Sequence, residues 1–220
     1  MTDAPILSIL TFLPLVGVVF ILGVRGTEQT VARNARNVAL WTTVITFAVS
    51  LILWFGFNRE TADFQYVEQG DWLADGIRYQ LGIDGISMLF VLLSTLLMPL
   101  CILASWNSIT KRVREYMIAF LVMETLMIGV FTSMDLVMFF IFYEASLIPM
   151  FLIIGVWGGQ NRVYASLKFF MFTFAGSVLM LLSILYMYWR TGTTDIPTLM
   201  EFDFTAQEQY WLWIAFFISF

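Results

Sequence analysis

The sequence predicts an all-α membrane protein, a polytopic bundle of transmembrane helices. Hydrophobic residues make up 60% of the chain and charged residues only 12%. Soluble domains are about 45–50% apolar and about 25% charged. The apolar residues also gather in runs that are long enough to cross a bilayer, which takes about 20 residues. A soluble fold of this size could not bury so much apolar surface, whereas lipid can cover it.

Six apolar runs have the length of a membrane span, and a seventh is incomplete. The six cover residues 5–24, 38–57, 86–106, 117–134, 136–157 and 167–189. The seventh starts at Tyr210 and reaches residue 220 after too few residues to cross a bilayer. We therefore expect these residues to be the N-terminal part of one transmembrane domain in a longer protein, although a short terminal helix is the alternative. The first run lacks the basic flank of a signal peptide, so we expect it to be retained.

Basic residues alternate between the loops and predict the orientation. Most of them lie after the first, third and fifth runs: Arg25, Arg33, Arg36, Lys111, Arg112, Arg114, Arg162 and Lys168. Only Arg59, Arg78 and Arg190 lie in the other loops. The positive-inside rule places the richer loops in the cytoplasm. The N-terminus then faces outward, to the periplasm in a bacterium.

The loop at residues 58–81 is predicted to face outward. Two short alternating stretches, at residues 64–67 and 77–81, favour a small hairpin there, and an irregular loop is the alternative. Residues 190–209, which include Pro197, form a second outward loop.

Two carboxylates lie near the middle of predicted spans. Glu124 is roughly 13 Å past Glu115, at the inner edge, and Glu144 is roughly 12 Å past Leu136, at the outer edge, in a hydrocarbon layer about 30 Å thick. Intramembrane acids of this kind usually pair, become protonated or line a wet cavity, so both are candidates for proton transfer. The alternative for Glu124, which we weigh equally, is a structural hydrogen bond to a neighbouring helix.

The surroundings of Glu144 favour a functional role more strongly. Its neighbours on the helix are apolar, and Pro149 leaves the carbonyl of Ala145 without its helical donor. Lys168 is a possible charge partner, although an interfacial lysine that snorkels to water is the simpler interpretation. The run Ala175-Gly176-Ser177 favours close helix packing, with water entry as the alternative.

Several other kinds of site are not expected. The chain has no histidine and a single cysteine, Cys101, which argues against haem, zinc and an internal disulfide. The run Leu81-Gly82-Ile83-Asp84-Gly85-Ile86-Ser87 lacks the glycine spacing of a nucleotide site. Asp84 or Ser87 is instead placed to cap the third span.

The same LGIDGIS run, the segment at residues 114–159 with its FYEASLIPMFLIIGVWGG stretch, and ASLKFFMFTFAGS at residues 165–177 resemble one family. They are similar to the antiporter-like, proton-pumping membrane subunits of respiratory complex I. The resemblance extends over essentially the whole chain. It implies about fourteen spans in an antiporter-like inverted-repeat architecture.

The resemblance also implies a function. Such subunits move protons while a distant arm of the complex passes electrons from NADH to quinone. The key acid of the fifth span matches Glu144, and its partner in the family is a lysine of a broken seventh helix. No cofactor is implied for this subunit, because NADH and quinone are bound by other subunits. The implied partners are the other membrane-arm subunits, among them neighbouring antiporter-like subunits, and the lipid bilayer, with no nucleic acid.

The implied location is the bacterial inner membrane, or the mitochondrial inner membrane in a eukaryote. Two other functions suit the same residues. One is a subunit of a multisubunit cation/proton antiporter, in which buried acids would serve equally well. The other is a passive membrane scaffold, which predicts that both glutamates tolerate substitution.

Overall fold

The computed structural model describes residues 5–74 and 76–219 and divides into two compact units. The first unit contains residues 1–68 and 82–132, and the second contains residues 69–81 and 133–220. Six of the described helices are long and apolar enough to cross a membrane, which confirms the predicted number of complete spans. The last residue of the predicted seventh run, Phe220, lies outside the described residues.

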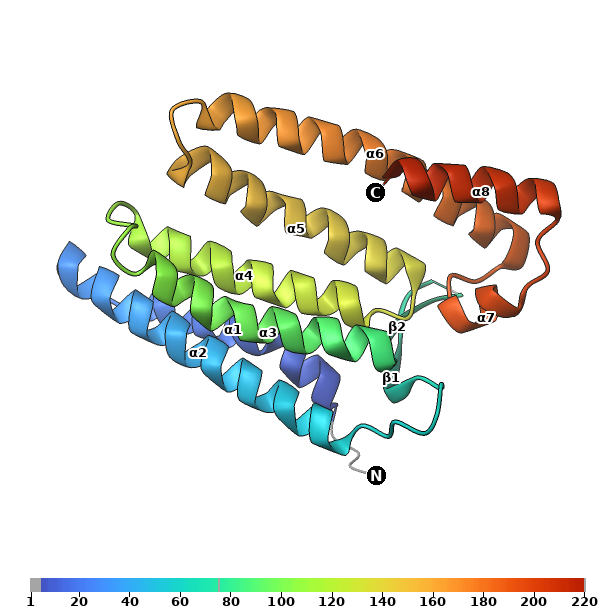
Figure 1. Ribbon diagram of the computed structural model, residues 1–220, viewed down its shortest axis with the longest axis horizontal. Coiled ribbons are helices and arrows are strands. Elements are labelled where there is room, and N and C mark those ends of the chain that lie inside the picture. Colours follow the sequence, from blue (N-terminus) through green and yellow to red (C-terminus); the bar gives the residue numbers. More distant parts are fainter. Residues whose placement is uncertain (1–4, 75, 220) are drawn as a thin grey trace. The chain divides into compact units, whose positions relative to one another are not determined.

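Four helices form the first unit (Figure 1). They are α1 (Ile6–Gly23), α2 (Glu28–Gly56), α3 (Gly85–Ser105) and α4 (Val113–Thr132). α1 packs against α2 and α4, and α3 packs against the same two helices. A Cβ atom on Gly17 of α1 would lie 2.5 Å from the Thr42 hydroxyl of α2, so these two helices approach closely only because this residue is glycine.

Polar side chains cap the helices of the first unit. Glu68 accepts hydrogen bonds from the backbone N–H groups of Leu7 at 2.6 Å and Ser8 at 3.0 Å, so its charge meets the positive N-terminal end of α1. At the start of α3, Ser87 N–H donates to Asp84 at 2.7 Å and Asp84 N–H donates to Ser87 Oγ at 2.8 Å. This reciprocal capping box confirms that both residues cap the third span.

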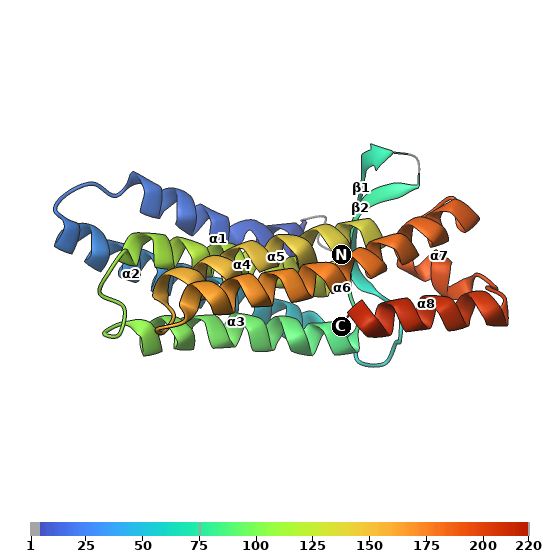
Figure 2. The same ribbon diagram turned by 90° about the horizontal axis from the view of Figure 1, so that it is seen from above.

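The second unit is built on a pair of long helices, α5 (Leu136–Trp157) and α6 (Arg162–Thr191). α8 (Ala206–Ser219) packs against α6, and the two lie side by side in both views (Figures 1 and 2). A short helix, α7 (Ile196–Glu201), lies in the 190–209 loop, where Asp195 caps it through Thr198 N–H at 2.9 Å.

The loop at 58–81 contains a two-stranded sheet, so the chain is not purely helical. β1 (Gln65–Ala74) pairs with β2 (Ile77–Ile83) (Figure 2). The hairpin alternative is therefore confirmed, but the first strand continues well beyond residue 67. The Asp75-Gly76 dipeptide is a strong hairpin signal, and Gly76 adopts a φ of +85°, which favours glycine.

Several helices extend beyond the predicted apolar runs. α2 begins at Glu28 rather than residue 38, and α6 begins at Arg162 rather than residue 167. These extra turns are polar and lie at the basic ends of the helices. Hydrophobicity marks only the part of a helix that lipid covers, so it underestimates the length of a helix that continues into water.

Candidate functional site

Glu124 lies on α4 within the first unit and is completely buried. Among the described residues, neither of its carboxylate oxygens has a hydrogen-bond partner. The hydroxyls of Thr125 and of Thr11, on α1, are buried in the same unpartnered state. The structural alternative for Glu124, a hydrogen bond to a neighbouring helix, is therefore absent from the described part of the chain.

These three polar side chains lie at the same depth. Arg114 Nη2, at the start of α4, donates to the carbonyl of Leu22, at the end of α1, at 2.6 Å, so the two helices run antiparallel. The same number of residues separates Arg114 from Thr125 as separates Leu22 from Thr11, about 16 Å of helix in each case. Pro14 of α1 also lacks the N–H that would bond the carbonyl of Leu10 at this level.

Further hydroxyls are buried in the same four-helix unit. Thr43, Thr46 and Ser50 on α2 and Ser94 and Thr95 on α3 are all nearly inaccessible. Ser50 and Thr95 bond each other across the two helices at 2.8 Å. A buried acid in a four-helix packing with this many hydroxyls has polar groups from which water or a proton could be passed.

Glu144 lies on α5 in the second unit and is half-buried. Its Oε1 atom is buried and has no hydrogen-bond partner among the described residues. On the helix, Glu144 falls between Ile141 and Ile148, which are 42% and 58% exposed. Glu144 therefore lies on a face of α5 that the described residues only partly cover, whereas Glu124 is completely buried.

The depth of Glu144 follows from the packing of α5 on α6. The rings of Phe151 and Phe170 lie 5.6 Å apart in this antiparallel pair. Glu144 lies seven residues before Phe151, and Ser177 lies seven residues after Phe170, so Glu144 and Ser177 are at the same level of the pair. The run Ala175-Gly176-Ser177 thus lies at the depth of the acid.

Gly176 is a packing point, as expected. A Cβ atom there would lie 3.2 Å from the carbonyl oxygen of Ser219 on α8, so glycine allows the end of α8 to approach α6. A cavity of about 300 Å³ lies at the same place. Its lining includes Tyr143, Thr173, Ala175, Gly176 and Ser219. The small residues therefore favour close packing and also border a space large enough for water.

The structure does not bring Lys168 to Glu144. Lys168 is exposed, and its Nζ lies 5.9 Å from the ring centre of Tyr164 on its own helix. In the α5–α6 register it is displaced from Glu144 by about 14 Å along the axis, at which distance unit charges interact by only about 1 kcal/mol. A direct ion pair between these two side chains is absent, and the geometry agrees with an interfacial lysine.

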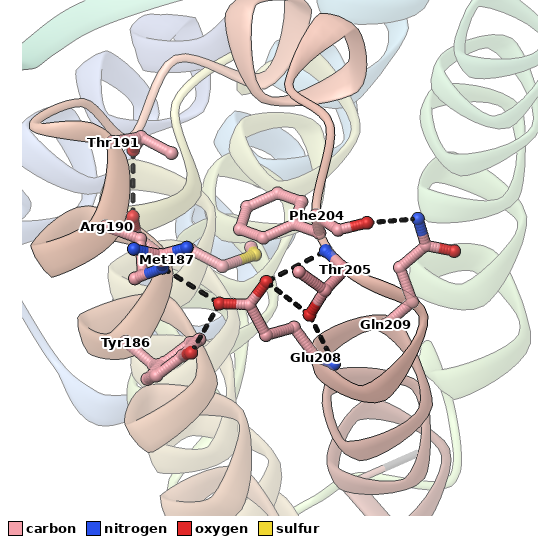
Figure 3. A network of polar contacts seen from close by, with 8 residues as sticks. All are labelled: Tyr186, Met187, Arg190, Thr191, Phe204, Thr205, Glu208 and Gln209. Atoms are coloured by element: carbon pink, nitrogen blue, oxygen red, sulfur yellow. Dashed lines mark hydrogen bonds and ion pairs between the residues drawn. The ribbon is translucent and has the colours of Figure 1, made fainter.

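The start of α8 is bound to the end of α6 by the carboxylate of Glu208 (Figure 3). It accepts hydrogen bonds from Tyr186 Oη at 2.7 Å, from Arg190 Nε at 2.8 Å, and from the backbone and hydroxyl of Thr205, both at 2.8 Å. The Tyr186 and Thr205 donors, together with Arg190, lower the pKa of Glu208 to about 2. This cluster fixes the position of α8 on α6.

Asp135 is a buried acid that was not predicted from the sequence. Its Oδ1 accepts from Val137 N–H at 2.9 Å and Met138 N–H at 3.1 Å, which caps α5. Its Oδ2 accepts from Arg78 N–H at 3.3 Å and from the Thr194 hydroxyl at 2.5 Å. An aspartate just before an apolar run is a cap signal, but the contacts with β2 and the loop after α6 have no signal in the sequence.

No group of His, Cys, Asp or Glu side chains within residues 5–74 and 76–219 is arranged to hold a metal ion.

Two family models match the chain. NADH-ubiquinone oxidoreductase chain 4, amino terminus, matches residues 29–133, and NADH:quinone oxidoreductase/Mrp antiporter, TM, matches residues 133–220. NADH-quinone oxidoreductase subunit M of Rhodobacter capsulatus is 53% identical over 98% of this chain and 44% of its own length. NADH-ubiquinone oxidoreductase chain 4 of Marchantia polymorpha is 46% identical over 97% of this chain and 43% of its own length. The chain thus spans less than half the length of these relatives.

Solved structures agree with these matches. A chain of respiratory complex I from Thermus thermophilus superposes with a TM-score of 0.81 at 27% identity, over 97% of this chain and 43% of that one. A chain of the Mrp complex from Dietzia sp. gives a TM-score of 0.79 at 15% identity, over 97% of this chain and 23% of that one, which shows the shared fold alone. The chain is a multi-pass membrane protein, and the resemblance inferred from its sequence is confirmed: it belongs to the NADH:quinone oxidoreductase/Mrp antiporter transmembrane family, in the branch of NADH-ubiquinone oxidoreductase chain 4.

Proposed function

We propose that this chain is part of a proton-translocating membrane-arm subunit of NADH:quinone oxidoreductase, with Glu144 and Glu124 as proton-transfer residues. One observation carries the proposal: both glutamates lie inside spanning helices, and both oxygens of Glu124 and the Oε1 of Glu144 are buried without a hydrogen-bond partner among the described residues. Retaining an unpaired acid at such a depth costs stability, so a function that uses its proton explains why it is there.

The position of α8 supports Glu144 as the main site. α8 approaches Gly176 through Ser219, at the depth of Glu144, and a cavity with Tyr143 in its wall adjoins that point. In the family, the partner of this acid is a lysine of the seventh helix. A lysine one turn beyond Ser219 would lie near the depth of Glu144, where unit charges 4 Å apart interact by about 4 kcal/mol at an effective dielectric of 20. That energy amounts to several pKa units at 1.36 kcal/mol each.

The redox reaction belongs to other subunits in this proposal. NADH and quinone bind elsewhere in the complex, this chain holds no cofactor, and its partners are the other membrane-arm subunits, including neighbouring antiporter-like subunits. The N-terminus faces the periplasm, because the basic loops lie after α1, α3 and α5.

The test is a Glu144→Gln substitution in the intact complex, reconstituted in vesicles. Glutamine keeps the size of the side chain and removes the titrating group. We expect assembly to be normal and NADH-driven proton release to fall by on the order of 10²-fold, the low end of what a positioned acid or base contributes. The matched control is Glu201→Gln, at an exposed position at the end of α7, which should pump normally. Wild-type pumping in the Glu144→Gln complex would overturn the proposal.

The alternative is a subunit of a multisubunit cation/proton antiporter. The family model over residues 133–220 includes such proteins, and the Mrp complex shares the fold. Co-purification distinguishes the two: iron–sulfur and flavin subunits indicate the oxidoreductase, and antiporter subunits alone indicate the exchanger. A passive scaffold predicts that neither glutamate affects ion transport.

A further inference from the structure

A pocket of about 510 Å³ opens in the first unit at the basic ends of its helices. The first turns of α2 and α4 and the end of the loop between α3 and α4 form its wall. The lining residues are Glu28, Gln29, Val31, Ala32, Arg36, Thr110, Arg112, Val113, Arg114 and Glu115. None of them belongs to the proposed proton-transfer site.

Two of the three arginines in this wall are held in place by hydrogen bonds to backbone carbonyls, and each has further N–H donors that these bonds do not use. Arg36 Nη2 donates to the Ile109 carbonyl at 2.8 Å, and its guanidinium carbon lies 6.0 Å from the ring centre of Trp106. Arg114 Nη2 donates to the Leu22 carbonyl at 2.6 Å. The Nε atom of each arginine is buried and has no partner among the described residues. A guanidinium has five N–H donors, and the described residues bond only the Nη2 group of each arginine, so the ends of both side chains have donors left for a ligand in the pocket.

The charge of the pocket favours an anion. The lining contains three arginines and two glutamates, Glu28 and Glu115, and both glutamates are exposed to solvent. No salt bridge joins these acids to the arginines in the part of the chain that the structure describes. The N-terminal turns of α2 and α4 add backbone N–H groups and the positive ends of two helix dipoles.

The neighbouring surface is apolar and matches an acyl chain. Val19, Phe20 and Leu22, at the end of α1 that Arg114 contacts, are 68%, 65% and 56% exposed. A lipid whose headgroup occupied the pocket could lay its hydrocarbon on this surface. The basic loops also mark the cytoplasmic side, where the leaflet carries anionic lipids.

We propose that this pocket binds the phosphate of an anionic phospholipid from the cytoplasmic leaflet. Arg36 and Arg114 supply fixed donors, and Arg112 supplies a further charge at the wall. Arginine suits this role because its planar fork matches the oxygens of a phosphate group. The bound lipid would contact α2 and α4 through its headgroup and α1 through its acyl chain, and so would stabilise the packing of these three helices at the membrane surface.

The test measures lipid retained by the delipidated complex after exposure to phosphatidylglycerol or phosphatidylcholine nanodiscs, by native mass spectrometry. The Arg36→Gln/Arg114→Gln variant should bind phosphatidylglycerol at least about tenfold more weakly. The control Arg25→Gln/Arg33→Gln removes the same charge from exposed positions on the same side and should bind as the wild type does. Equal losses in the two variants would overturn the proposal, because they would indicate general surface charge.

A second variant guards against misfolding. The side chain of Arg112 makes no hydrogen bond to the described residues, so Arg112→Gln should leave the unit intact and weaken phosphatidylglycerol binding about fivefold. Unchanged binding in this variant and in the Arg36→Gln/Arg114→Gln variant would contradict a pocket site. Displacement of the lipid by millimolar inorganic phosphate, with no preference for phosphatidylglycerol over phosphatidylcholine, would identify a free-phosphate site instead and also overturn the proposal. Pumping activity is not the readout, so the result is independent of the role of Glu144.

Discussion

Among the described residues, two carboxylates are buried almost completely, and their surroundings are opposite. Asp135, 1% exposed, accepts hydrogen bonds from three backbone N–H groups and the Thr194 hydroxyl. Glu124, 0% exposed, has no hydrogen-bond partner among the described residues. Burial alone therefore does not identify a functional acid. A satisfied carboxylate holds elements together, whereas an unsatisfied one in a spanning helix is available for proton chemistry.

The largest expected effect on stability is at Asp135. Asp135→Ala should lower the free energy of unfolding by about 3 kcal/mol, because it removes the cap of α5 and leaves buried donors without an acceptor. Thermal unfolding of the detergent-solubilised protein measures it. Asp135→Asn is the matched control, since its amide oxygen can still cap the helix, and it should cost roughly 1 kcal/mol. Equal losses in the two variants would mean that the charge, rather than the set of hydrogen bonds, provides the stability.

Glu124 should respond with the opposite sign. Glu124→Met replaces an unpartnered acid with an apolar side chain of similar volume and should raise the stability by about 1 kcal/mol while it lowers proton pumping. Glu115→Met removes an exposed acid from the first turn of the same helix and should leave pumping unchanged. The stability comes from thermal unfolding, and the pumping from the reconstituted complex. A loss of stability as large as that of Asp135→Ala would show that bound water satisfies Glu124, and the contrast between the two acids would disappear.

The sequence was informative where one residue or one run carries its own signal. The six spanning helices follow from apolar length, and the two mid-membrane glutamates follow from the cost of a charge in lipid. The hairpin of β1 and β2 was only one of two alternatives, because the alternation of apolar and polar residues is confined to 64–67 and 77–81, whereas β1 continues to Ala74. The N-terminal turns of α2 and α6 were not predicted, since these turns are polar and hydrophobicity does not mark them.

Contacts between distant segments could not be predicted in the same way. Asp135 meets Arg78 N–H and the Thr194 hydroxyl, which lie far from it in sequence, and nothing in a single sequence pairs them. For the same reason Lys168 was a reasonable partner for Glu144 by charge. Only the register of α5 on α6 shows that the two lie at different depths.

The smallest expected effect concerns Glu208, which accepts several hydrogen bonds, as Asp135 does, but is more exposed to solvent. Its bonds to Tyr186, Thr205 and Arg190 lower its pKa from 4.5 to about 2, and it precedes the apolar run that starts at Tyr210. A lowered pKa means that the stabilisation is complete above about pH 4.5 and is lost as the pH falls toward 2. Because the intrinsic rate of amide exchange itself falls with acid over this interval, the quantity to compare is the protection factor. We expect the protection of amides at the start of α8 to decrease modestly over that interval in the wild type.

The matched variants make this pH dependence specific. Glu208→Gln should show lower protection factors already at neutral pH and little further change in them on acidification, because the titrating group is gone. Glu201→Gln, an exposed acid at the end of α7, should retain the wild-type profile. A full acid-induced change in Glu208→Gln would assign the effect to other groups. If replacing Glu208 instead lowered the free energy of unfolding as much as replacing Asp135 does, hydrogen bonding rather than burial would decide how much a carboxylate stabilises this fold.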